Sequence, residues 1–171
     1  MGNRAVIAFG DQNPNNVGIY LHWNGGRESI EGFMRAAKEL GVRDPSYDKP
    51  YCVARIAQII GNFFGGTCSI GVDILNNLDC DNGDNGVFVV GPDFEIVSGR
   101  QSGLEKERHD AYTQGVYEQC MLKNGGISKK MAEALDGIIK NFDESVRTEE
   151  TIDEFPALKA CVEALKLYKD Y

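Results

Sequence analysis

Four side chains that can do chemistry lie between residues 20 and 27, namely Tyr20, His22, Asn24 and Arg27. An imidazole titrates near neutral pH and serves as a general base or as a recognition contact, and a guanidinium binds anions. The segment 17–27 predicts a strand that ends in a Gly-Gly turn, which brings these groups to the point where a strand becomes a helix. Three roles stay open for His22: a hydrogen-bonded structural residue, a binding surface shared with Tyr20, or catalysis.

Three carboxylates, those of Asp79, Asp81 and Asp84, lie in a second segment, which is rich in Asn and Gly. Hard cations such as calcium prefer oxygen ligands on flexible loops. The spacing does not fit a calcium-binding loop, because Gly83 and Asp84 occupy the wrong positions when the count starts at Asp79. We therefore expect a solvated hairpin loop with no bound metal, and an adventitious divalent site is the alternative.

No catalytic signature is found in the rest of the sequence. His109 lies in a charged run, residues 105–110, that is typical of a solvated helix surface. The Gly-rich segment around Arg100 suits an anion, but no strong helix start follows it. The cysteines are odd in number and none has CxxC spacing, which argues against a Cys-based zinc site and favours reduced thiols in a cytosol; they are Cys52, Cys68, Cys80, Cys120 and Cys161. We expect no enzymatic activity and no cofactor.

The charge of the chain restricts its partners. It carries 26 acidic and 18 basic side chains, a formal net charge of −8. Direct binding to nucleic acid needs clustered Lys and Arg, and binding to an anionic membrane surface also needs basic residues. Neither is expected here. An acidic chain is steered toward basic partners, although solubility alone is a sufficient reason for such a charge.

Hydrophobic periodicity predicts a series of strands and helices. Arg4–Phe9 and Val17–Trp23 form a hairpin, in which Ile19, Leu21 and Trp23 share the core face. Further strands are expected at 67–75, 87–90 and 95–97, and helices at 29–40, 51–64, 128–142 and 153–168, whereas 101–123 is polar and mixed and is expected to be partly helical. The order of elements shows no regular alternation of strand and helix. We therefore predict a single α+β domain over residues 1–171, with an antiparallel sheet of about five strands, a hairpin plus a three-stranded meander, packed with four to five helices.

Four strings carry a resemblance to known sequences: RAVI at 4–7, GIYLHWNGGR at 18–27, IGNFFGG at 60–66 and DNGDNG at 81–86. Over about its first 100 residues the chain is similar to short proteins of phages, prophages and mobile elements of gut-type bacteria. The resemblance implies a small acidic phage protein, a class that includes inhibitors of host defence and, among them, anti-CRISPR proteins that block Cas9. It assigns no role to any single residue.

Three functions follow as hypotheses. The first is an interaction protein of the bacterial host cytosol that binds and inhibits a basic host protein, with a nucleic-acid-handling CRISPR nuclease as the named case. Its contacts would be Asp79, Asp81, Asp84 and the 20–27 cluster, helped by the acids at 143, 144, 149 and 150. The second is a small-molecule or nucleotide-binding protein or small enzyme that uses Tyr20, His22 and Arg27, with Arg100 as an anion clamp. The third is an accessory subunit, dimeric through an exposed sheet edge.

Overall fold

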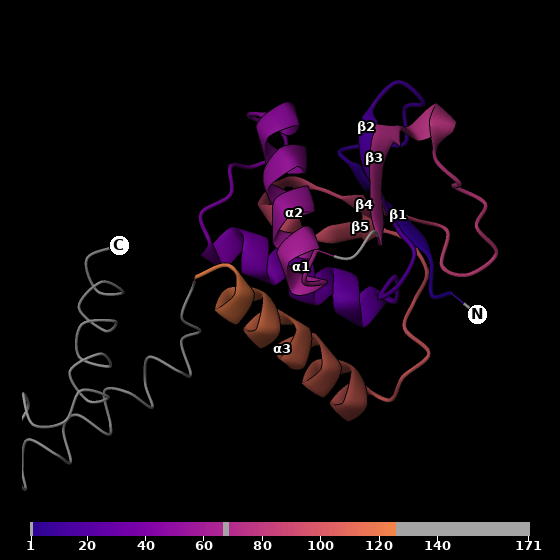
Figure 1. The fold of residues 1–171 in the computed structure, drawn as a ribbon. Coiled ribbons are helices and arrows are strands. Elements are labelled where there is room, and N and C mark those ends of the chain that lie inside the picture. The colour runs from indigo at the N-terminus through magenta and orange to yellow at the C-terminus, as the bar shows by residue number, and fades with distance from the viewer. Residues whose placement is uncertain (1, 67–68, 126–171) are drawn as a thin grey trace, which may run out of the picture. The chain divides into compact units, whose positions relative to one another are not determined.

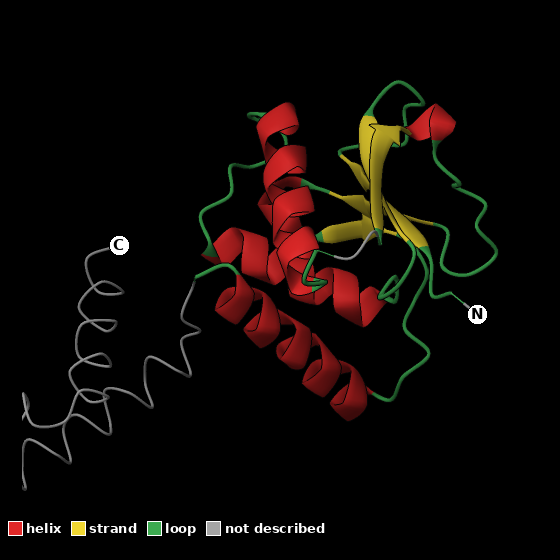
Figure 2. Ribbon diagram, viewed as in Figure 1, coloured by secondary structure: helices red, strands yellow, loops and turns green. Residues whose placement is uncertain are grey.

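Five strands form one mixed sheet in the order β3-β2-β1-β4-β5, with the helices α1, α2 and α3 on one side of it (Figures 1 and 2). The structure, a computed structural model, describes residues 2–66 and 69–125. The described elements, in chain order, are β1 (Ala5–Phe9), β2 (Val17–Leu21), α1 (Arg27–Glu39), α2 (Lys49–Phe63), β3 (Ile70–Ile74), the short 3₁₀ helix η1 (Leu75–Asn77), β4 (Val87–Val90), the short 3₁₀ helix η2 (Pro92–Phe94), β5 (Ile96–Ser98) and α3 (Lys106–Lys123).

The predicted α+β class and the first hairpin are confirmed, because β1 and β2 pair antiparallel. The predicted three-stranded meander is wrong. β3 pairs with β2, whereas β4 pairs with β1 in parallel, so β3 and β4 lie on opposite sides of the hairpin and the sheet is mixed. β3 and β4 run in the same direction, and parallel strands need a crossover connection rather than a tight turn. Residues 75–86 provide that crossover.

The helices match their predicted places, with shifted ends. Asp48 caps α2 by accepting a hydrogen bond from the Tyr51 amide at 3.2 Å, and Pro50 lies in the first turn. Gly41, with φ of +69°, follows the end of α1 in the left-handed conformation that a helix end favours. Three α-helices lie in the described part of the chain, and those expected at 128–142 and 153–168 fall outside it. The described residues belong to one unit, Met1–Gly126, and the single domain over 1–171 stays a prediction.

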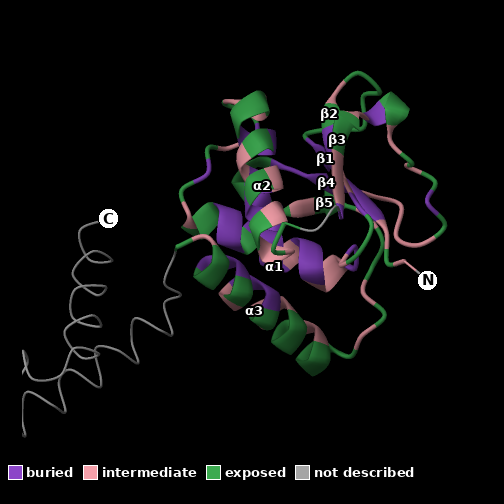
Figure 3. Cartoon of the chain, viewed as in Figure 1, coloured by how far each residue is buried: buried purple, intermediate pink, exposed green. Residues whose placement is uncertain are grey.

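β1 is buried along its whole length because it is the central strand and both of its faces are covered (Figure 3). Ala5, Ile7 and Phe9 face the helices and belong to the main core. Val6 and Ala8 face the other way and pack with the crossover segment. An unbroken apolar run is the pattern of a strand that is covered on both faces.

Two glycines allow close packing around this sheet. A Cβ atom at Gly18 would lie 2.5 Å from Leu75 and 2.9 Å from the Ile7 carbonyl oxygen, so the crossover packs on the sheet only because β2 has no side chain there. A Cβ atom at Gly32 would lie 2.8 Å from Val116, so α1 and α3 are in close contact at this point. The sheet therefore has a helix-covered face and a face covered by residues 75–86, which we call the crossover face.

Candidate functional site

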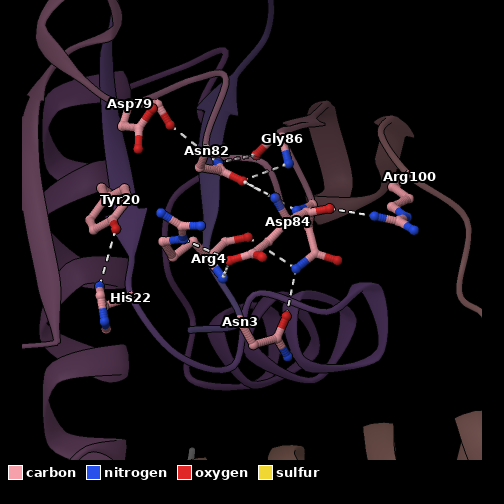
Figure 4. Close-up of polar contacts among 10 residues, drawn as sticks. Asn3, Arg4, Tyr20, His22, Asp79, Asn82, Asp84, Gly86 and Arg100 are labelled. Atoms are coloured by element: carbon pink, nitrogen blue, oxygen red, sulfur yellow. Dashed lines mark hydrogen bonds and ion pairs between the residues drawn. The ribbon is translucent and has the colours of Figure 1, made fainter. Parts of the chain in front are cut away.

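Asn82 organises the acidic segment on the crossover face (Figure 4). Its side chain is almost fully buried, at 3% exposure. The amide oxygen accepts hydrogen bonds from the backbone amides of Asp84, Asn85 and Gly86 at 3.1–3.2 Å. The amide nitrogen donates to the carbonyl oxygens of Asp79 and Gly86 at 3.1 and 3.2 Å. Buried backbone groups need partners, and one side chain supplies five of these hydrogen bonds, so the loop has a defined shape.

Asp84 ties this loop to the start of β1. Its carboxylate accepts hydrogen bonds from the Arg4 side chain at 2.7 Å and from the Arg4 backbone amide at 3.1 Å. These hydrogen bonds hold the pKa of Asp84 below its ordinary value, and the same side-chain contact raises the pKa of Arg4. On the other side of the loop, the Arg100 guanidinium donates to the Asp84 carbonyl oxygen. Asp84 is thus a structural anchor more than a free contact.

Asp79 and Asp81 are the exposed carboxylates of this loop. Among the described residues neither forms an ion pair with a basic side chain. Along the sequence they have no basic neighbours, because residues 56–99 contain no Lys, Arg or His and six acids: Asp73, Asp79, Asp81, Asp84, Asp93 and Glu95. The described ranges hold no group of three or more His, Cys, Asp or Glu side chains that could bind a metal ion. The loop therefore presents negative charge on a fixed backbone.

Tyr20 and His22 lie together on the crossover side of β2. The Tyr20 hydroxyl and His22 Nδ1 are 3.2 Å apart, within hydrogen-bonding distance. Arg4 lies between Tyr20 and Asp84 (Figure 4), and the pKa of Arg4 is raised by Asp84, with smaller contributions from Tyr20 and Asp79. Arg4 therefore joins Tyr20 to Asp84, which lies 64 positions further along the sequence.

The expectation that Trp23 belongs to the core is wrong. The strand ends at Leu21, so the alternation of faces stops before Trp23 is reached. Trp23 is 44% exposed, and its ring makes an edge contact with His22 at a centroid distance of 5.1 Å. Trp23 consequently extends the exposed surface that Tyr20 and His22 begin.

Asn24 and Arg27 interact with other partners. Asn24, with φ of +54°, donates through Nδ2 to the hydroxyl of Tyr112 on α3 at 3.4 Å. Arg27 pairs with Glu31 on α1, Nε to Oε1, at 2.8 Å. The 20–27 cluster is therefore divided among three surroundings and is not one site.

His109 differs from the solvated surface expected for it. Its side chain is 16% exposed, and Nε2 lies 3.4 Å from Oε2 of Glu31. Arg27, on the same helix as Glu31, contacts the other oxygen of that carboxylate, so the link from Glu31 to α3 is its contact with His109. His109 thus has a positioning contact between two helices.

A hollow of about 450 Å³ lies between the start of α1 and the loop that contains Asp84. Arg27 and Arg100 line it, as do the carboxylate-bearing residues Glu28 and Asp84. Glu28 also accepts a hydrogen bond from the Ser102 hydroxyl at 3.2 Å. The charges of the hollow are mixed, and its carboxylates oppose an anion.

Reasoning from the sequence missed Arg4 and Asn82, the two residues on which this surface depends. Asn82-Gly83 is a turn signal, so a structural role for Asn82 was open to prediction from the sequence. Nothing in the sequence marks Arg4, because its partner is 80 positions away.

Comparison with protein-family models, with curated proteins and with solved structures gives no match to this chain. Among the described helices, none combines the length and the apolar character needed to cross a membrane.

Proposed function

We propose that this chain is a non-enzymatic interaction protein of phage or mobile-element origin that binds a basic host protein in the bacterial cytosol and inhibits it. The observation that carries the proposal is the Asn82-organised loop, which holds the exposed carboxylates of Asp79 and Asp81 in one place without basic neighbours in sequence from 56 to 99. A fixed arrangement of charge loses less conformational entropy on binding than a mobile one. Nucleic-acid-handling nucleases present the complementary basic surfaces, and a CRISPR nuclease is the named case.

Tyr20, His22 and Trp23 provide the second part of the proposed contact surface. Aromatic side chains with a polar tip are favoured at binding surfaces, and Trp23 is exposed beside His22. Charge on the loop would steer the partner and set its orientation, and the aromatic group would contribute apolar contact. The proposed surface leaves out Asn24 and Arg27, because each already has a hydrogen-bond partner, Tyr112 and Glu31 respectively.

The test is a pull-down from bacterial cytosol, treated beforehand with a nuclease so that nucleic acid cannot bridge bait and prey. The bait is the full chain, its D79N/D81N variant, or a charge-matched control, E39Q/E107Q, that removes two exposed acids from helices. We expect a basic protein to be captured by the chain and by the control, and to be lost with D79N/D81N. Raised salt should release it. Equal capture by the two double variants would contradict the proposal.

Inhibition is measured on the captured protein. If it is a nuclease, its cleavage of a DNA substrate should fall in the presence of the chain and recover with D79N/D81N. Removing charges at the rim of an interface acts mainly on the association rate, so the association rate for D79N/D81N should be lower by about tenfold at low salt. Quenching of the fluorescence of Trp23, the one Trp of the chain, reports contact with the aromatic part of the surface.

A second candidate function, a small-molecule or nucleotide-binding protein or small enzyme, is favoured by one observation. Arg27 and Arg100 line the same hollow, as an anion clamp would require. Tyr20 and His22 do not line it, so the predicted cluster would contribute Arg27 alone. Calorimetric titration with ATP tests it: heat of binding that disappears in Arg100→Ala supports this function, and no heat with the unchanged chain rejects it.

A further inference from the structure

β3 is the terminal strand of the sheet, and its outer edge has no neighbouring strand in the described part of the chain. Its register with β2 shows which backbone groups point outward. The backbone amide of His22 donates to the Ser69 carbonyl oxygen at 2.9 Å, and the backbone amide of Leu75 donates to the Asn16 carbonyl oxygen at 2.8 Å. Hydrogen-bonded and non-hydrogen-bonded pairs alternate along an antiparallel ladder. Residues 69, 71, 73 and 75 therefore bond to β2, and the backbone groups of residues 70, 72 and 74 point away from it.

The backbone amide of one of these outward-facing residues already has a hydrogen-bond partner. The Ile74 amide donates to Oδ1 of Asp73 at 2.7 Å, and the Asp73 carboxylate also accepts from Asn77 Nδ2. Within the described part of the chain, the amide and carbonyl groups of Ile70 and Val72 remain at the free edge. An exposed strand edge is a template for pairing with a further strand, which natural proteins otherwise protect.

The helix-side face of this edge is an apolar groove. A hollow of about 370 Å³ runs between α2 and the paired strands β2 and β3. Its lining includes Val53, Ala54 and Ala57 from α2 with Val17 and Val72 from the sheet, and Lys49 is its charged member. Val72 is 50% exposed although it lines this groove. A strand added beside β3 would direct every second side chain onto this face.

The opposite face of the same edge is acidic. Asp73 pairs with Gly18, on the crossover face of the sheet, and is exposed. The acidic loop with Asp79 and Asp81 follows it along the chain, and no basic side chain occurs in residues 56–99. The alternate side chains of an added strand would therefore meet negative charge on this face.

We propose that β3 is a docking edge for an extended segment of a basic partner, in which apolar residues alternate with Lys or Arg. The apolar side chains enter the groove beside Val72, and the basic side chains face Asp73. Backbone hydrogen bonds to Ile70 and Val72 give affinity, and the two faces give specificity, as in other cases of strand addition. The inference rests on the proposed function, since it names the segment by which the basic partner is held.

The experiment uses the full chain labelled with ¹⁵N and a capped peptide of about seven alternating Val and Lys residues, a usual strand length. We expect the peptide to shift the amide signals of β3 and of the α2 residues that line the groove. A peptide with Glu in place of Lys should cause no shift. A Val/Lys peptide with N-methyl groups on the edge that pairs should also lose binding, and this control leaves the protein unchanged.

Two variants at one position isolate the edge. Val72→Pro removes an amide that points away from β2, so the β2 ladder keeps its hydrogen bonds. Val72→Thr keeps both the amide and the β-branched shape. We expect Val72→Pro to weaken peptide binding by about tenfold or more and Val72→Thr to have a smaller effect. Equal binding by the chain and by Val72→Pro would overturn the proposal, as would tight binding of the N-methylated peptide.

Other occupants of the edge give different results, each of which also overturns the proposal. If a second copy of the chain pairs with β3, the chain without peptide sediments as a dimer and Val72→Pro does not. If residues 126–171 of the chain itself cover the edge, Val72→Pro shifts their signals when no peptide is present. Failure of the proposed function is distinguishable, because in that case D79N/D81N leaves capture of the partner unchanged whatever the peptide does.

Discussion

The two faces of the sheet are stabilised by different forces. The helix-covered face is apolar: Ile7, Phe9, Ile19, Leu21 and Phe88 are completely buried beneath the helices. The crossover face has a small apolar cluster around Val6, Ala8, Leu75 and Val89, and beyond it the segment is held by the hydrogen bonds of Asn82 and Asp84. The candidate site lies on the crossover face because a loop fixed by polar contacts keeps its carboxylates exposed. On the other face, the helices cover the side chains of the sheet.

The largest effect is expected on the helix-covered face. Phe88 and Val89 are neighbours on β4 and point to opposite faces. Phe88→Ala should lower the free energy of unfolding by about 3–5 kcal/mol, because it removes a buried ring and leaves a cavity. Val89→Ala should cost about 1–2 kcal/mol, from the loss of two methyl groups. Denaturant unfolding measures both, and equal losses would contradict the proposed difference between the faces.

Asn82→Ala should break the order of the crossover face. The variant lacks the side-chain amide that forms five hydrogen bonds with backbone groups of the loop, and water can replace this amide only in part. We therefore expect the free energy of unfolding to fall by about 1–3 kcal/mol. Asn76→Ala, at an exposed position of the same crossover segment, is the matched control and should have no measurable effect. Asn82→Ala should also weaken partner capture as D79N/D81N does. A stable Asn82→Ala chain with full capture would show that loop order is not needed.

Thiol labelling sharpens the comparison residue by residue. Burial raises the pKa of Cys52 and of Cys120 to about 12, and both lie on the helix side. Cys80 on the crossover face is half-buried, and its pKa is raised by burial and by Asp79. At about pH 8, Cys52 and Cys120 should react at least about tenfold more slowly than Cys80. Mass spectrometry of the labelled peptides measures each site, and comparable rates would argue against two differently protected faces.

The smallest effect concerns the pH dependence contributed by Asp84. Its pKa is lowered by the hydrogen bonds from Arg4, so ionised Asp84 stabilises the folded chain. That contribution is present above the ordinary carboxyl pKa and is lost as pH falls through the lowered value. Asp84→Asn lacks it, and the gap in melting temperature between the chain and this variant should close as pH falls from about 5 toward 2. A gap that stays constant over this range would exclude ionisation as its cause.

Much of the fold was open to prediction because it depends on local signals. The strand at 4–9 and the helices at 29–40 and 51–64 were predicted from the periodicity of short segments, and the structure confirms them with shifted ends. The prediction of a three-stranded meander was wrong because the turn residues in 76–86 indicate that the chain changes direction, but not which strand it pairs with next. Gly18 and Leu75 determine where the crossover lies, and their contact joins residues that are far apart in the sequence.

The sequence by itself determined the α+β class, the periodicity of the strands and helices, and the acidic character of residues 56–99, because each depends on residue types and near-neighbour spacing. Only the tertiary structure decided that β1 is central, that Trp23 is exposed, and that Arg4 lies between Tyr20 and Asp84. These depend on long-range packing and on hydrogen bonds between distant residues. A one-dimensional pattern of hydrophobicity and charge contains no record of such pairings.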